Sequence, residues 1–158
     1  MESGRGSGSG SGSEIRPAAG IFRSIVAAFD GSPSSRRAVL VACALASELG
    51  GEAHVVVVVV PRSRAETPDE EAEELARESD QLVSDAISLG AEQHQDLTAA
   101  VHVLVDEDPS AAIGDLVVQR AFDLIVVGAH GRDRVMHHGI GRALENLLSR
   151  LVCPVLVV

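Results

Sequence analysis

The chain has 158 residues and a formal net charge of −10, from 23 acidic and 13 basic side chains. A chain of this length folds most simply as one domain, and its acidity excludes the clustered positive charge with which proteins bind nucleic-acid phosphates. Only three side chains are aromatic, all of them Phe, so stacking platforms for bases are not expected either and we predict no nucleic-acid partner.

The first 20 residues differ in composition from the rest of the chain. Residues 1–14 read MESGRGSGSGSGSE, a Gly/Ser-rich coil with almost nothing to bury. We interpret residues 1–20 as a flexible tail or linker and residues 21–158 as the folded domain. The basic start and apolar stretch of a signal peptide are missing, and the longest apolar run, HVVVVVV at 54–60, is too short to span a bilayer. We therefore expect a cytoplasmic protein without membrane contact.

Short runs rich in Val and Ile alternate with longer helical patterns from Ser24 onward. The expected strands are 24–29, 53–60, 99–105, 123–127 and 154–158. Six consecutive valines make the second run apolar on both faces. Such a run is typical of a central parallel strand that helices cover on each side.

Start and stop signals of helices stand between these strands. The expected helices are 33–49, 68–89, 110–121 and 142–152. Ser32 and Thr67 each precede a Pro and so predict N-caps, and Glu70 completes a capping box with Thr67. Gly50 and Gly90 predict the ends of the first two helices.

The alternation of strands and helices predicts an α/β fold, a doubly wound parallel sheet with right-handed crossovers and helices on both faces. Ligands bind such sheets outside the carboxyl ends of the strands, where the strand order reverses. Function is therefore expected on the loops that follow the first four strands. They are DGSPSS at 30–35, PRSRAETP at 61–68, DEDPS at 106–110, and the glycine-rich stretch at 126–142.

The stretch VVGAHGRDRVMHHGIGR at 126–142 contains four glycines, three histidines and three arginines. Gly128 and Gly131 let the backbone turn off a strand and approach a ligand closely. Gly139 and Gly141 do the same before a helix whose free N–H groups suit phosphate. The spacing is not the dinucleotide fingerprint, and the absence of lysine from the whole chain excludes a Walker A loop. Phosphate binding and a plain surface loop both remain open at this point.

Four separated segments resemble the universal stress protein family. Gly128, Gly131 and Gly141 match its nucleotide-binding signature, in which the third glycine precedes Ser or Thr. The segments IVAAFDGSPSSRRAVLVACALA, IVVGAHGR and LENLLSRLVCPVLVV are also typical of the family. The resemblance covers about residues 21–158. It implies a five-stranded parallel sheet of order 3-2-1-4-5, a homodimer, and binding of ATP or a related nucleotide.

The resemblance also implies which residues surround the nucleotide; all follow strands or lie in the glycine-rich stretch. They are Ala28, Asp30, Val59, Val127, Gly128, His130, Gly131, Arg132, Gly141, Arg142 and Ala143. By this analogy Ala28 and Asp30 border the adenine and ribose, and Val59 contacts the base. Val127 and the glycines surround the sugar and phosphates, and Ala143 supplies a backbone amide.

The sequence departs from the family at Arg142, where nucleotide binders carry Ser or Thr. A guanidinium there can replace the lost hydroxyl with a bidentate contact, or turn to solvent and leave a weaker site. Together with Arg132 and Arg134 it concentrates positive charge in an acidic protein. This contrast favours an anionic ligand, with three solvated loop arginines as the alternative.

No metal site or catalytic centre is predicted. His130 stands where the family commonly has His, and the adjacent His137 and His138 have no carboxylate or Cys at ligand spacing, so Mg²⁺ is expected only together with ATP. No GxSxG elbow or comparable catalytic context is present, and we expect no enzyme. Cys43 and Cys153 lack CxxC partners and are expected to be buried, reduced thiols.

The sequence thus predicts a stress-response regulatory protein that binds ATP, ADP or AMP and acts through a homodimer. A dimeric interaction module of the same fold without nucleotide is the alternative, to which Arg142 points; a slow ATPase is a weaker one. The apolar strand 154–158 is expected at a sheet edge, where pairing with a second copy would cover it.

Overall fold

The computed structural model describes residues 21–61, 67–97, 100–131 and 142–158, without the side chains of Arg142 and Ala143. The predicted tail, residues 1–20, lies outside these ranges. Within them, five strands form one sheet of order β3-β2-β1-β4-β5 in which every neighbouring pair is parallel. The strands are β1 (Ser24–Phe29), β2 (Glu52–Val59), β3 (Val101–Val105), β4 (Leu124–Val127) and β5 (Val155–Val157). The predicted fold class is confirmed.

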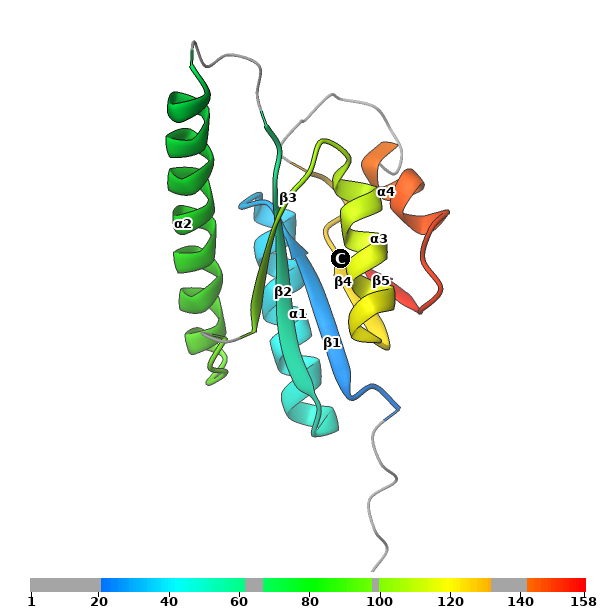
Figure 1. Cartoon of the computed structure of the whole chain (residues 1–158). Helices are drawn as coiled ribbons and strands as arrows, with labels where there is room; N and C mark the ends of the chain where they lie inside the picture. Colours follow the sequence, from blue (N-terminus) through cyan, green and yellow to red (C-terminus); the bar gives the residue numbers. More distant parts are fainter. Residues whose placement is uncertain (1–20, 62–66, 98–99, 132–141) are drawn as a thin grey trace, which may run out of the picture.

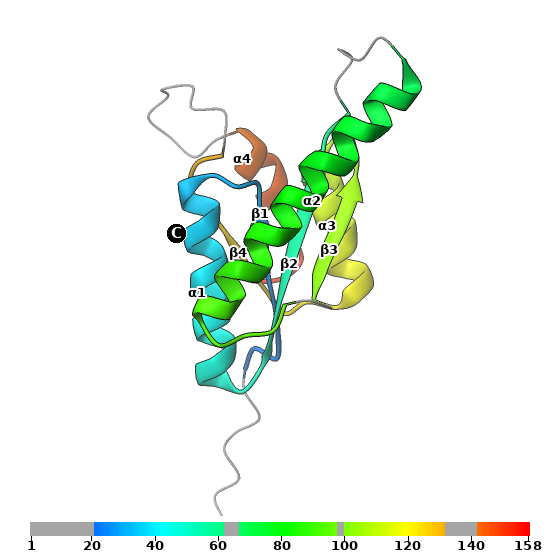
Figure 2. The same cartoon turned by 90° about the vertical axis from the view of Figure 1, so that its left-hand side faces the viewer.

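In the same described ranges, four helices cover this sheet, two on each face. They are α1 (Pro33–Leu49), α2 (Pro68–Glu92), α3 (Pro109–Arg120) and α4 (Arg142–Leu148). Figure 1 shows α1 and α2 on one side of the sheet and α3 and α4 on the other. In the perpendicular view, α1 and α2 lie in front of the sheet, with α2 crossing it obliquely (Figure 2). None of the described helices is long and apolar enough to cross a bilayer.

Two cores result because the strands are apolar on both faces and successive side chains point to opposite sides. On the side of α1 and α2, Ile25 and Phe29 of β1 pack with the buried valines at 55, 57 and 59 of β2. On the side of α3 and α4, Val26 and Val56 pack with Ile125 of β4. The valine run therefore occupies the second strand of a five-stranded sheet and faces helices on both sides, as predicted.

The predicted N-caps are present. The Ser32 hydroxyl accepts a hydrogen bond from the Ser35 amide at 3.2 Å, and the Thr67 hydroxyl accepts one from the Glu70 amide at 3.3 Å. Helix α1 ends at Gly50, which adopts the left-handed conformation with φ of 66°. The Ser32 cap fixes where α1 begins after the carboxyl end of β1.

Gly90 does not end α2, contrary to the prediction; the helix continues to Glu92. Gly90 is buried inside the helix, where an added Cβ would lie 2.6 Å from Cγ of Leu97. The glycine is therefore needed for close packing of the returning chain and does not serve as a C-cap. Helix α4 is also shorter than predicted and ends at Leu148, after which the Arg150 and Leu151 amides both donate to the Leu147 carbonyl.

Candidate functional site

The strand order reverses at β1, which lies between β2 and β4. Ala27 of β1 pairs with Val126 of β4, so the loops that follow these two strands begin side by side. We call residues 30–35, which include the first turn of α1, and residues 128–131 the switch-point loops. In a doubly wound sheet this is the position where ligands bind.

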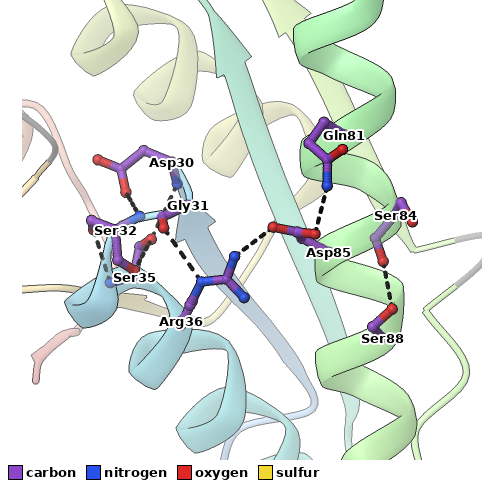
Figure 3. Close-up of polar contacts among 9 residues, drawn as sticks. All are labelled: Asp30, Gly31, Ser32, Ser35, Arg36, Gln81, Ser84, Asp85 and Ser88. Carbon is purple, nitrogen blue, oxygen red and sulfur yellow. Dashed lines mark hydrogen bonds and ion pairs between the residues drawn. The ribbon is translucent and has the colours of Figure 1, made fainter.

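Asp30 opens the first switch-point loop and is held at both its backbone and its side chain. Its carboxylate oxygen Oδ1 accepts a hydrogen bond from the Ser32 amide at 2.9 Å, and its own amide donates to the Ser35 hydroxyl at 3.3 Å (Figure 3). This Asx-type turn sets the direction of the carboxylate relative to α1. The second oxygen, Oδ2, lies 3.2 Å from the position that a Cβ on Gly131 would take. Asp30 and Gly131 therefore face each other across the two loops.

Gly128 brings the two loops into direct contact. A Cβ on Gly128 would lie 2.6 Å from the Ser34 hydroxyl oxygen and 2.7 Å from the Ser34 carbonyl carbon. The Ser34 hydroxyl donates to the His130 carbonyl, and the Ser32 hydroxyl donates to the same oxygen at 3.4 Å. The sequence predicted Gly128 but missed Ser34. The only signal for it is the run of small polar residues at the start of α1, in which Ser32 alone was interpreted as a cap.

The loop after β4 is also bound from its other side. The Ala129 amide donates to the Val158 carbonyl at 2.8 Å, and the Val158 amide donates to the Val127 carbonyl at 2.9 Å. The second switch-point loop is thus held between the start of α1 and the residue that follows β5. A chain segment fixed on both sides loses little conformational entropy when a ligand binds to it.

The remaining predicted residues differ in exposure. His130 and Gly131 are exposed, and Ala28 is half-buried. Val59 is 1% exposed and Val127 is 4% exposed, so both side chains belong to the cores in the arrangement described here. Arg132 and Gly141 lie outside the described residues. Arg142 and Ala143 begin α4, but their side chains also lie outside the description.

A cavity of about 480 Å³ lies elsewhere, beside the end of β2 and the first half of α2. The acidic residues Glu71, Glu74 and Glu78 line it together with Arg77, Gln81 and the apolar Val60 and Leu75. Three acidic side chains against one arginine leave the lining net negative, which does not suit phosphate. The cavity therefore does not compete with the switch-point loops as a candidate for the anionic ligand that the sequence suggests.

A second polar cluster, which the sequence analysis missed, lies near the amino ends of β2 and β3. His102 Nε2 and His54 Nδ1 are 3.2 Å apart, and His54 Nε2 lies 3.7 Å from a Glu52 carboxylate oxygen. Both rings pack against Phe122, with centroids 5.0 Å and 5.7 Å from it. Burial lowers the pKa of both histidines. His54 and then Arg120 lower the pKa of His102 further, whereas Glu52 opposes the lowering of the His54 pKa, to which Arg120 adds a smaller contribution.

Neither cysteine is placed as a nucleophile. Both are free; Cys43 is buried and Cys153 half-buried, so only the first matches the predicted burial. Burial raises the pKa of the Cys43 thiol to about 11 and also raises that of Cys153. A thiol that stays protonated at neutral pH is a poor nucleophile and a poor metal ligand. Among the described residues, no three His, Cys, Asp or Glu side chains are grouped to hold a metal ion.

An open parallel sheet of order β3-β2-β1-β4-β5 with helices on both faces defines the doubly wound α/β class. Comparison with known proteins gives the family. The model of the universal stress protein family matches residues 21–158. A universal stress protein of Thermus aquaticus is 30% identical over 141 residues, which cover 87% of this chain and 99% of that protein.

Solved structures agree with this assignment at the level of the fold. Universal stress protein UspA from Lactobacillus plantarum has a TM-score of 0.73 at 20% identity, covering 87% of this chain and 97% of that one. A universal stress protein from Archaeoglobus fulgidus in complex with dAMP has a TM-score of 0.65 at 24% identity, covering 87% and 98%. This chain belongs to the universal stress protein family.

Proposed function

We propose that this protein binds an adenine nucleotide at the switch-point loops and acts as a regulatory protein without an enzymatic activity of its own. One observation carries the proposal. The first two glycines of the spaced signature, Gly128 and Gly131, follow β4 at the point where the strand order reverses, directly beside Asp30 of the neighbouring strand. The dAMP complex of the Archaeoglobus relative supports adenine nucleotide as the ligand class.

The roles of the described residues follow from their chemistry. An ionised carboxylate accepts hydrogen bonds, and Asp30 is suited to receive those of the ribose hydroxyls. The Ser34 contacts fill the space beside Gly128, so the nucleotide is proposed to lie over Asp30 and the exposed Gly131. Gly131 has no side chain there to block the approach of a ligand to the backbone.

The phosphates are proposed to lie against the residues between Gly131 and Ala143, most of which are outside the described structure. The support here is the sequence alone. Gly141 stands at the signature spacing, and Arg132 and Arg142 supply positive charge in a chain of net charge −10. Any Mg²⁺ at the site is proposed to arrive with ATP, held by its phosphates, and no protein side chain is assigned as its ligand.

We also propose a homodimer that pairs through residues 154–158. β5 is an edge strand of the sheet, and Val157 on it is 40% exposed. An apolar edge of this kind is stabilised by pairing with another strand. Val157→Glu should therefore shift the protein from dimer to monomer in light scattering at micromolar concentration, while Val118→Glu on α3 should not. A wild-type monomer under these conditions would contradict the proposal.

The nucleotide proposal is tested first on freshly purified protein. After denaturation, the supernatant is analysed by ion exchange for released nucleotide, and the emptied protein is titrated calorimetrically with ATP, ADP and AMP, with and without Mg²⁺. We expect close to one adenine nucleotide per chain, or a binding isotherm with that stoichiometry. An empty supernatant together with no heat for any of the three nucleotides would refute the proposal.

Two glycine variants locate the site. Gly131→Val should abolish binding, because a branched side chain there meets the Asp30 carboxylate and covers the backbone that the ligand approaches. Gly114→Ala on α3 is the matched control, since its Cβ would meet only Arg150 Cβ at 3.6 Å. Retained affinity in a folded Gly131→Val protein would overturn the assignment of the site.

A second function is favoured by one residue. Arg142 stands where the nucleotide binders of the family carry Ser or Thr, and a dimeric interaction module without nucleotide would not need that hydroxyl. Arg142→Ser separates the two functions. If the protein is an interaction module without nucleotide, the variant gains a binding that the wild type lacks. Under the proposed function the wild type already binds, and the variant keeps or raises the affinity if Arg142 is only a poor substitute for the hydroxyl, or loses affinity if the guanidinium contacts phosphate.

A further inference from the structure

Arg36 connects the first switch-point loop to helix α2. Its Nε donates to the Gly31 carbonyl at 3.4 Å, and its Nη2 lies 2.5 Å from the Asp85 carboxylate of α2. The guanidinium carbon also lies 6.0 Å from the ring centroid of Phe29, the last residue of β1. Figure 3 shows the guanidinium between Gly31 and Asp85, with one side turned to each.

The Gly31 carbonyl belongs to the turn that directs Asp30. Gly31 has φ of 81°, a left-handed conformation that favours glycine. Its peptide units lie between Asp30 and Ser32, whose amide binds the Asp30 carboxylate at 2.9 Å. Rotation of the Gly31 peptide would move the Ser32 amide and with it the carboxylate. The hydrogen bond from Arg36 Nε to the Gly31 carbonyl therefore influences the direction of the Asp30 carboxylate, although Arg36 does not contact Asp30 in this arrangement.

Asp85 holds the guanidinium from the other side. One carboxylate oxygen of Asp85 contacts Arg36, and the other accepts a hydrogen bond from the Gln81 amide at 2.9 Å. The Asp85 carboxylate is thus held by Gln81 of the same helix, independently of its contact with Arg36. A planar guanidinium presents its donors in a rigid fork, so fixing Nη2 also fixes the direction of Nε.

This ion pair contributes little to global stability. The Arg36 and Asp85 side chains are 44% and 25% exposed, and exposed pairs of this kind are screened by water and salt. Its two ends nevertheless lie on different elements: Arg36 is in the first turn of α1, next to the turn of the candidate site, and Asp85 is in the second half of α2. The main effect of this ion pair is therefore to fix the position of the Arg36 guanidinium between the Gly31 turn and α2.

We propose that Arg36 is a positioning residue of the nucleotide site: anchored by Asp85 of α2, it holds the Gly31 carbonyl and so directs the Asp30 carboxylate toward the ligand. This inference rests on the proposed function. It makes the nucleotide affinity dependent on where α2 lies relative to α1. Because coupling between two sites is reciprocal, whatever moves α2 changes the affinity, and the nucleotide in turn favours one position of α2.

The test compares Arg36→Gln and Asp85→Asn with Arg37→Gln, which removes the neighbouring exposed guanidinium of the same helix. Binding of ATP and of 2′,3′-dideoxy-ATP is measured by calorimetry, and the midpoint of thermal unfolding is recorded for each protein. We expect Arg36→Gln to weaken ATP binding by up to about tenfold, the upper end for the loss of one hydrogen bond. Asp85→Asn should weaken it less, and Arg37→Gln should leave it within about twofold.

The dideoxy nucleotide separates positioning from a purely structural effect. If Arg36 acts through Asp30 on the ribose hydroxyls, Arg36→Gln lowers the affinity for ATP but hardly that for the analogue without these hydroxyls, so the ratio of the two falls toward one. General loosening of the fold would weaken both nucleotides equally and lower the unfolding midpoint. Arg36→Lys, which keeps the charge beside Asp85 without the fork, should give an intermediate ratio.

The outcomes are distinguishable. Wild-type protein that binds neither nucleotide overturns the proposed function and this inference with it. Wild-type protein that binds ATP while Arg36→Gln behaves like Arg37→Gln overturns the positioning role and leaves the proposed function intact. An equal loss for ATP and the dideoxy analogue also overturns it. If Arg36→Gln does not fold, the same comparison is made with Asp85→Asn and Arg36→Lys, and an unchanged ratio in both refutes the proposal.

Discussion

Replacement of Gly128 by Ala tests whether the two switch-point loops are packed too closely to admit a Cβ at this position. The new Cβ would lie 2.6 Å from the Ser34 hydroxyl oxygen, 2.7 Å from the Ser34 carbonyl carbon and 2.8 Å from its Cβ. Rotation of the Ser34 side chain moves only the hydroxyl oxygen, because the carbonyl carbon and Cβ are held by the backbone in the first turn of α1. The start of α1 or the loop after β4 must therefore move.

The expected cost follows from overpacking. Inserting a methyl group into a site without room destabilises a protein by about 1–3 kcal/mol. For a chain of this length, a loss of about 2 kcal/mol lowers the midpoint of thermal unfolding by about 4–8 °C. Helix propensity gives no compensation, since Gly128 follows a strand and lies outside the helices. The free energy of unfolding is measured by urea denaturation, and the variant is compared with wild type where both show the same dependence of that free energy on urea concentration.

Gly114→Ala is the matched control and should behave in the opposite way. It adds the same methyl group in the interior of α3, where the Cβ meets only ordinary contact at 3.6 Å. Replacing Gly by Ala inside a helix stabilises it by up to about 1 kcal/mol. A Gly128→Ala protein as stable as wild type, or an equal loss in both variants, would refute the steric argument. Ser34→Ala should not rescue Gly128→Ala, because it removes only the hydroxyl oxygen.

The histidine pair and the two thiols give further predictions. Because burial lowers the pKa of His54 and His102 in the folded state, unfolding takes up protons below the ordinary value of 6.5, and stability should fall as the pH drops from 6.5 through the lowered pKa values. Urea denaturation between about pH 5 and pH 7.5 should show this slope; an equal slope in a double variant, His54→Gln with His102→Gln, would disprove the assignment to this pair. In native protein at neutral pH, a thiol reagent should label Cys153 well before Cys43, which has no exposed surface and a pKa of about 11; mass spectrometry of digests would reveal the reverse order if the burial were wrong.

Only those residues of the candidate site that family resemblance or local spacing indicates could be predicted from the sequence. Gly128 and Gly131 stand at the signature spacing, and Asp30 follows the first strand, so their meeting at the switch point followed once the sheet order was predicted. Ser34 and Arg36 could not be found in this way. Arg36 is followed by another arginine, and no local pattern tells which of the two faces α2.

The sequence by itself determined the elements whose causes are local. Six valines make a strand apolar on both faces, and the caps at Ser32 and Thr67 need only hydrogen bonds to amides three residues further on. Only the tertiary structure decided contacts between distant parts of the chain. Ser34 meets His130 across 96 residues, His54 meets His102 across 48, and Gly90 is small because Leu97 returns over it. Such contacts depend on strand register and helix packing, which hydrophobic periodicity leaves undetermined because it fixes the face of each element but not its partner.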